Sequence, residues 1–335
     1  ATTGDVMVDA RSSGSIFLEG YGVGVSVAAG AAAISGGGVG VVARVVSDAV
    51  TEALISGGSD VDALAGGVRV DALDERTIDI DALGVTIGVA GGSLAIAGTV
   101  TVIEAVADYA STVRAAILDS AVTAGAGNVI VDADATTSSL LRADGVSFSL
   151  AASGGISGSF AAAAGVVKNT LAQVVEALIV DSDAAGGQGV TASGAVSVTA
   201  DDAVTMTANA NAISVSLSIS NPFTASIAFS VSAAIAMNKL SGSTIARVSD
   251  SRVAADGGAV TVRATTASNL TTTPDAVAIS AAISLASISA AGAGASGIAT
   301  VTREVRALVE DGSDIDAQGN VIVRAQDNLV SDVDV

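Results

Sequence analysis

The sequence predicts an all-β protein, a parallel β-helix (β-solenoid) built from about five repeats of roughly 61–67 residues. One observation is a short phrase in which apolar and polar residues alternate before an alanine. It begins at Val6, Val68, Val129, Val196, Val260 and Val321, at steps of 62, 61, 67, 64 and 61 residues. A fixed long period is typical of an array whose units bury apolar faces against their neighbours. The other observation is alternation with period two, which predicts strands with one inward and one outward face.

The repeat predicts a single continuous β-solenoid over residues 1–335, with no internal domain boundary. The expected units are 6–67, 68–128, 129–195, 196–259, 260–320 and a partial unit at 321–335. The chain begins and ends within the pattern, and we interpret it as a stretch of a longer protein.

Each unit contains a turn rich in Asp, Ser and Gly before the phrase, residues that favour turns for steric and hydrogen-bonding reasons. These turns lie at 57–60, 119–120, 181–183, 250–251 and 311–314. A unit is therefore expected to be a series of strands joined by turns, although 105–118 and 169–179 also fit a short amphipathic helix. If a unit made three rungs of about 20 residues or two of about 30, the array would be a rod rising roughly 75 Å or 50 Å.

Composition restricts the kind of core and partner. Half of the residues are hydrophobic but only 2% are aromatic, and 38 glycines accompany two prolines, which indicates a thin interior of small and β-branched side chains. The net charge of −20 makes nucleic acid an unexpected partner. Cysteine and histidine are absent, which removes disulfides, thiolate metal sites and the commonest acid–base residue.

One part of every unit is nearly free of charge. These stretches are 22–42, 84–103, 145–167, 204–237 and 276–301. Three interpretations stay open: a wider core packed with Ala and Gly, a lateral patch that meets another copy, and contact with a membrane. None of the stretches is expected to be a transmembrane helix, because glycine and serine interrupt them and the alternation persists.

Pairs of aspartates that flank one apolar residue are the candidate metal ligands. The pairs are Asp60 with Asp62, Asp79 with Asp81, Asp132 with Asp134, and Asp314 with Asp316. Both members of a pair leave a strand on the same side, and oxygen ligands suit calcium. We predict that Asp60, Asp62, Asp314 and Asp316 are the calcium candidates, and we expect no other cofactor. The alternative is that the carboxylates are solvated surface charges.

The sequence offers little for catalysis. Parallel β-helices also include carbohydrate-active enzymes, but the few aromatic residues are scattered and the arginines fall at repeated positions. A catalytic site would break the repeat at one place. We therefore expect no enzyme activity, with a carbohydrate-active β-helix enzyme as the alternative.

The phrase together with its preceding turns, as in residues 311–325, resembles the repeat region of giant bacterial surface or secreted adhesins of the filamentous haemagglutinin and leukotoxin-like type. The resemblance covers essentially the whole chain. It implies an extracellular or cell-surface stalk, filament or matrix element that self-associates into fibres or lateral assemblies and contacts cell surfaces or polysaccharides. A calcium-dependent surface-layer component is a further alternative.

Overall fold

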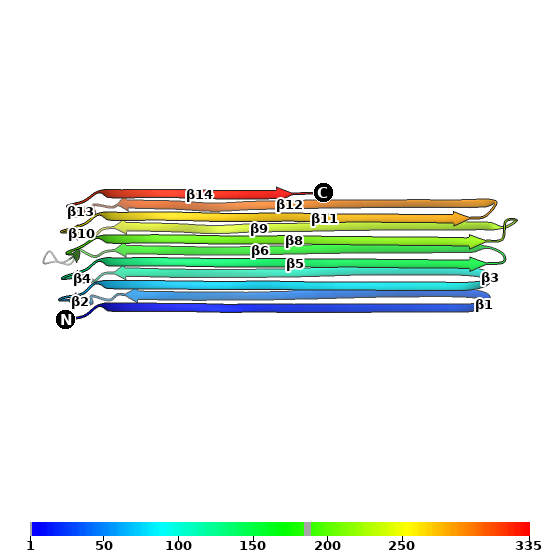
Figure 1. Cartoon of the computed structure of the whole chain (residues 1–335), viewed down its shortest axis with the longest axis horizontal. Coiled ribbons are helices and arrows are strands. Elements are labelled where there is room, and N and C mark those ends of the chain that lie inside the picture. The colour runs from blue at the N-terminus through cyan, green and yellow to red at the C-terminus, as the bar shows by residue number, and fades with distance from the viewer. Residues whose placement is uncertain (1, 184–188) are drawn as a thin grey trace.

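The computed structural model describes residues 2–183 and 189–335, which form a parallel β-solenoid with one coil per repeat unit (Figure 1). Each full coil has a long outgoing leg, a long returning leg and a short third strand. Outgoing legs occupy the first parts of β1 (Val6–Ile55) and β3 (Val68–Leu118), and all of β5 (Val129–Ser153), β8 (Val196–Ser220), β11 (Val260–Ile283) and β14 (Val321–Val333). Returning legs occupy the second parts of β1 and β3, and all of β6 (Ser157–Val180), β9 (Ala225–Ser249) and β12 (Ala286–Glu310). The short strands are β2 (Asp60–Ala63), β4 (Ala121–Ala124), β7 (Val190–Ala192), β10 (Arg252–Ala255) and β13 (Asp314–Ala317).

The repeated phrase is stacked in register through the whole molecule. Val68 pairs with Val6 on one side and with Val129 on the other, and the phrase of every later coil pairs in the same way. All of these pairings are parallel, and the long strands belong to one nine-stranded sheet while the short strands form a second sheet of five. The predicted parallel β-helix is thus confirmed.

The size of a coil differs from the sequence-based estimate of two or three rungs per unit. One unit makes one coil, because each leg runs for about 25 residues before it turns, as in β8. Five steps of about 4.8 Å give a stack only roughly 24 Å high, whereas a leg of that length extends roughly 80 Å. The molecule is therefore a flat blade whose long axis follows the strands, as Figure 1 shows, rather than a rod that grows along the stack.

The two segments that also fitted a helix are extended. Residues 105–118 lie in the returning leg of β3 and residues 169–179 lie in β6, where each residue pairs with one in the neighbouring coil. The described part of the chain contains no helix. These segments form strands and not helices because every second side chain is buried between the layers, which matches a period of two.

We call the end of the blade that carries the short strands the base, and the far end, where outgoing legs turn into returning legs, the tip. At the base each returning leg ends at a residue in the left-handed region: Gly57, Asp119, Asp181, Asp250 and Asp311 have φ between 45° and 73°. Glycine adopts this conformation without strain, and Asp does so more readily than most residues.

A serine stands one or two residues after each of these, and three hydrogen bonds between these serines link neighbouring coils. The Ser120 hydroxyl accepts a hydrogen bond from the Ser59 amide at 3.2 Å, and the Ser251 hydroxyl accepts one from the Ser182 amide at 3.1 Å. The turns predicted from Asp, Ser and Gly are therefore the corners of the coil.

The interior changes along the blade. Near the base, a core of Val, Ile and Ala is closed on three sides by both legs and the short strand, as in Val68, Ile117 and Val122. Farther along, a second cluster is built by the two legs alone and includes Ile80, Ile103 and Leu141. Close to the tip only a small group of alanines remains. The large buried side chains are thus concentrated in the basal half.

In the distal half, glycines allow the two layers to approach closely. A Cβ on Gly165 would lie 2.7 Å from the Asn211 carbonyl oxygen and 2.8 Å from the Ala143 carbonyl oxygen, both in the outgoing layer. A side chain at this inward position has no room, so the blade is thin there. Gly84 instead makes room for the large Ile103 side chain, whose Cδ1 would lie 2.1 Å from an added Cβ.

Candidate functional site

Three carboxylates meet on the outer surface of the outgoing layer near the base. Asp71 and Asp132 are neighbours in adjacent coils, and Asp134 lies two residues farther along β5. Oxygen atoms of the three lie within 4.8 Å of one another, and Arg69 Nη2 contacts Asp71 Oδ1 at 3.0 Å and Asp132 Oδ2 at 3.1 Å. This carboxylate cluster is the arrangement in the described residues that could hold a cation.

The electrostatics of the carboxylate cluster are dominated by negative charge. Burial, followed by the charges of Asp132, Asp201 and Asp71, raises the pKa of Asp134 to about 6, while Arg69 opposes the rise. Burial and the three neighbouring carboxylates disfavour the ionised form of Asp134. A divalent cation would relieve the repulsion, but calcium takes 6–8 oxygen ligands and the arginine already occupies one side.

The structure does not bring the four predicted calcium candidates together. Asp60 and Asp62 lie in β2, and Asp314 and Asp316 lie in β13, at opposite ends of the five-stranded sheet. Asp60, Asp314 and Asp316 are exposed, and Arg252 Nε lies 3.9 Å from Asp314 Oδ2.

Asp132 and Asp134, which the sequence also paired, do lie together. The additional member, Asp71, stands one repeat earlier than Asp132, at the fourth position of the same phrase. Superposing the repeats would have found it.

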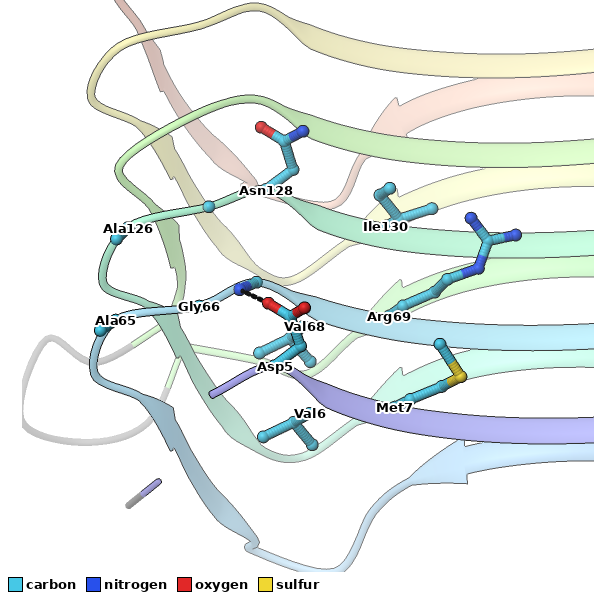
Figure 2. Close-up of a pocket in the computed structure, with 12 residues that line it drawn as sticks. Asp5, Val6, Met7, Ala65, Gly66, Val68, Arg69, Ala126, Asn128 and Ile130 are labelled. Carbon is cyan, nitrogen blue, oxygen red and sulfur yellow. Dashed lines mark hydrogen bonds between the residues drawn. The ribbon is translucent and has the colours of Figure 1, made fainter. Parts of the chain in front are cut away.

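A hollow of about 340 Å³ lies at the base, where the short strand turns into the outgoing leg (Figure 2). Asp5, the only carboxylate that lines it, accepts a hydrogen bond from the Gly67 amide at 2.8 Å. Met7, Arg69 and Ile130 stand side by side along one wall, from three successive coils. Because glycoside hydrolysis needs two carboxyl groups, this hollow lacks the usual means to cleave a sugar chain.

Polar groups are also buried between the layers, where the base meets the distal half. The Asp74 carboxylate, 1% exposed, accepts hydrogen bonds from Arg76 Nε at 2.9 Å and from the Tyr109 and Ser111 hydroxyls at 2.8 Å each. Burial above all raises the pKa of Tyr109 to about 12, so its hydroxyl stays a donor. These groups satisfy one another, and Asp74, Tyr109 and Ser111 are closed to solvent, which assigns them a structural role.

Two coils farther up, the same interior holds a buried ion pair. Arg303 Nη2 in the returning layer lies 2.7 Å from Asp202 Oδ2 in the outgoing layer, and the two side chains are 4% and 3% exposed. Burial raises the pKa of Asp202 to about 6, with Arg303 acting in the opposite direction. The pair joins the two faces of the blade across neighbouring coils.

In the distal half the interior is lined by Ser, Thr, Gly and Ala. Hydroxyls from the two layers are paired at oxygen–oxygen distances of 2.6 to 2.8 Å. The pairs are Ser26 with Ser35, Thr86 with Thr101, Thr99 with Ser147, Ser157 with Ser218, Ser159 with Ser216, and Ser214 with both Ser230 and Ser232. Most of these serines and threonines are buried. Small polar residues therefore take the place that large aliphatic ones hold at the base.

The outer surface of the distal half has the opposite character. Three adjacent columns on the outgoing layer, five coils deep, consist of apolar residues and contain no polar or charged one; we call them the outgoing apolar face. Its members are Val23, Val25, Val27, Val85, Ile87, Val89, Val146, Phe148, Leu150, Ile213, Val215, Leu217, Val277, Ile279 and Ala281. Val23 is 74% exposed and Ile279 is 53% exposed. Toward the base the next column already carries Asp144 and Asp275.

The uncharged stretches are thus neither wholly core nor wholly surface. Their small residues form the thin interior, as the wide-core interpretation expected in part, but their large side chains point away from it. The signal was present in the sequence as alternation of small or hydroxyl residues with Val, Ile, Leu and Phe, as in 145–151. What alternation alone left undecided was which set faced inward.

None of the family models, curated proteins or solved structures compared with the chain matches it. A search of the described residues found no helix of the length and hydrophobicity needed to cross a membrane.

Proposed function

We propose that this chain is a non-catalytic structural and adhesive element of a larger extracellular or cell-surface bacterial protein, serving as part of a stalk, filament or matrix. The observation that carries the proposal is the in-register stack, in which the phrase occupies the same place in every coil. Equivalent columns present the same kind of surface at each level. A repeated surface of this sort multiplies weak contacts into strong adhesion.

The mechanical part of the role follows from the backbone. Parallel ladders join each leg to its neighbours over about 25 residues, as between β8 and β11. Pulling adjacent coils apart along the stack breaks these hydrogen bonds together. Charge ladders across the outer base, such as Arg114 between Glu52 and Glu176, add contacts between coils.

The features of the site favour this role over a carbohydrate-active enzyme. The hollow at the base contains one carboxylate and is built from repeated positions, and the buried acids Asp74 and Asp202 are sealed between the layers. A sugar-cleaving site is expected to combine two accessible carboxyl groups with a binding groove.

A bead assay tests the proposal. Beads that carry the chain at rising surface density are applied to bacterial cells and to a panel of immobilised polysaccharides, and released reducing ends are measured in parallel. We expect adhesion to rise faster than linearly with density, without release of reducing ends. Cleavage of any polysaccharide, or no adhesion at any density, would contradict the proposal.

The carboxylate cluster favours a second candidate, a calcium-dependent surface component. Asp71, Asp132 and Asp134 would supply oxygen ligands at the outer base. Calcium would then raise the melting temperature, and chelation would reverse the rise. Asp132→Asn should abolish the shift, whereas Asp316→Asn, at an exposed position in β13, should leave it unchanged. A melting temperature indifferent to calcium would exclude this candidate.

A further inference from the structure

We propose that the outgoing apolar face pairs with the same face of a second copy of this chain, so that two blades pack sheet against sheet. The inference deepens the proposed structural role, on which it rests, by naming the partner and the surface that meets it. The returning layer and the tip lie outside this contact.

The residues of the outgoing apolar face are of the kind that one sheet buries against another, but no second sheet covers them in the part of the chain that the structure describes. Large aliphatic or aromatic residues fill 14 of its 15 positions, with Ala281 the exception. The central column contains Val25, Ile87, Phe148, Val215 and Ile279, stacked in adjacent coils. Such columns make ridges that interdigitate when two sheets pack about 10 Å apart.

The returning layer differs at the same level of the blade. Its outward positions include Gly36, Gly98, Ala162, Ala233 and Gly292, interspersed with Ile and Phe. This surface is uneven and offers fewer large side chains to bury. The contrast assigns the contact to the outgoing face.

The outgoing apolar face has the size of a small protein interface. Its three columns span roughly 20 Å along the strands, and five coils measure roughly 24 Å across. The product is roughly 480 Å² for each copy, or about 960 Å² for a pair, at the low end of the areas that protein–protein interfaces bury. An exposed apolar patch of several hundred Å² is typical of an interaction site.

The face is also held flat before a partner arrives. The long strands run nearly straight and side by side in Figure 1, and flat sheets of many strands are typically stabilised by stacking. Behind the face, the paired hydroxyls of Ser159 with Ser216 and of Ser214 with Ser230 fix the spacing of the two layers. Little conformational freedom is therefore lost when a second sheet docks.

A second copy fits better than a bilayer, because the regular columns of one face can interdigitate with those of another sheet, whereas fluid lipid chains present no fixed ridges. Because each copy carries a net charge of −20, pairing should strengthen as salt screens the repulsion.

Analytical ultracentrifugation of the full chain across the micromolar range tests the inference. We expect dimers or larger assemblies for the parent protein, and a dissociation constant at least about 100-fold weaker for Val215→Glu, which places an unpaired charge in the centre of the contact. Two controls carry the same new charge: Thr205→Glu on the outer base of the same strand, and Val231→Glu on the returning layer, where the side chain is 51% exposed. Both should stay within a few-fold of the parent protein.

A label reports on the contact without disturbing the charge. The chain contains no cysteine, so Val215→Cys and Val231→Cys each give a single attachment point for a spin label. Strong dipolar coupling between copies is expected at position 215 and not at 231, and dilution with unlabelled protein should remove it. Circular dichroism melting shows whether each variant is folded.

Four results would overturn the inference. They are a monomeric parent protein, a Val215→Glu variant that associates as well as the parent, a control that dissociates as strongly, and flotation of the parent protein as a monomer with phosphatidylcholine vesicles. A monomer would leave the proposed structural role intact, whereas polysaccharide cleavage would remove that role and leave the pairing. The two failures are therefore distinguishable.

Discussion

The basal and distal halves of the blade are built from the same strands but have opposite polarity. At the base, Val and Ile fill the interior and Arg and Asp face the solvent, as Val70 and Arg69 show within one strand. In the distal half, Gly, Ser and Thr fill the interior and Val, Ile and Phe face outward, as Ser147 and Phe148 show. A ladder of backbone hydrogen bonds continues through both halves. The backbone hydrogen bonds therefore set the architecture. The side chains determine locally which face of the sheet buries its large apolar residues away from water.

The two halves are stabilised by different means. A broad apolar core stabilises the base through burial from water. The distal interior buries mostly small side chains, so close contact of the layers and paired hydroxyls must hold it together. Substitutions of one kind should thus have different effects in the two halves.

The largest effect is expected where the halves meet, at the buried ion pair. Arg303→Met removes the partner of Asp202 and leaves a carboxylate enclosed between the layers, which should lower the free energy of unfolding by about 3–5 kcal/mol. Urea denaturation measures the change. The matched control is Arg263→Met at the outer base, where the pair with Asp201 is 2.7 Å long but the arginine is 44% exposed. It should lose less than about 1 kcal/mol, and equal losses would contradict the buried role of Arg303.

Next in size is the effect of filling the thin interior. Gly84→Val forces a side chain toward Ile103 and should destabilise the protein by about 1–3 kcal/mol. Gly98→Val lies on the same strand but faces outward, with no atom within 4 Å of the new Cβ. It should be neutral within about 0.5 kcal/mol or slightly stabilising, since valine favours strands. If both variants melted alike, the tight packing of Ile103 against Gly84 would be wrong.

A smaller effect is expected from the paired hydroxyls. Ser216→Ala leaves the buried Ser159 hydroxyl without its partner at 2.6 Å and should cost about 1–2 kcal/mol. The double variant Ser159→Ala with Ser216→Ala should lose less than the sum of the single changes, because neither hydroxyl then remains unpaired. Ser138→Ala, at an exposed position on β5, serves as the control and should change little. Additive losses would show that the two hydroxyls act independently.

The smallest effect concerns charge at the outer base and depends on pH. The pKa of Asp134 is raised to about 6 in the folded protein, above its ordinary value, so the folded state binds the proton more tightly. This contribution to stability is complete below pH about 4 and is lost as the pH rises through about 6. Asp134→Asn removes that loss, and the variant should exceed the parent by roughly 1 kcal/mol at pH 7, after allowing for solvent screening. Melting curves from pH 4 to 8 measure the difference, which should vanish at the acidic end; a variant less stable at pH 7 would contradict the repulsion.

Much of the fold could be predicted because the sequence repeat specifies the strands and the turns of each coil. The phrase at Val68 and its copies specified parallel stacking, and the residues at Asp119, Asp181, Asp250 and Asp311 specified the corners. The candidate site was less accessible. Asp132 and Asp134 could be paired from one strand, but Asp71 joins them only through the register between coils, and Asp60 and Asp314 are kept apart by the intervening short strands.

The sequence by itself determined the strands, their turns and the order in which equivalent segments stack. Hydrophobic alternation and turn residues are local properties, and they recur in every repeat. Only the tertiary structure decided that one unit makes one coil, that the long axis follows the strands, and that the large side chains of the uncharged stretches face outward. The physical reason is the separation of the two layers. Where glycines such as Gly165 bring the legs together, only small side chains fit between them, and the large ones must occupy the outer surface.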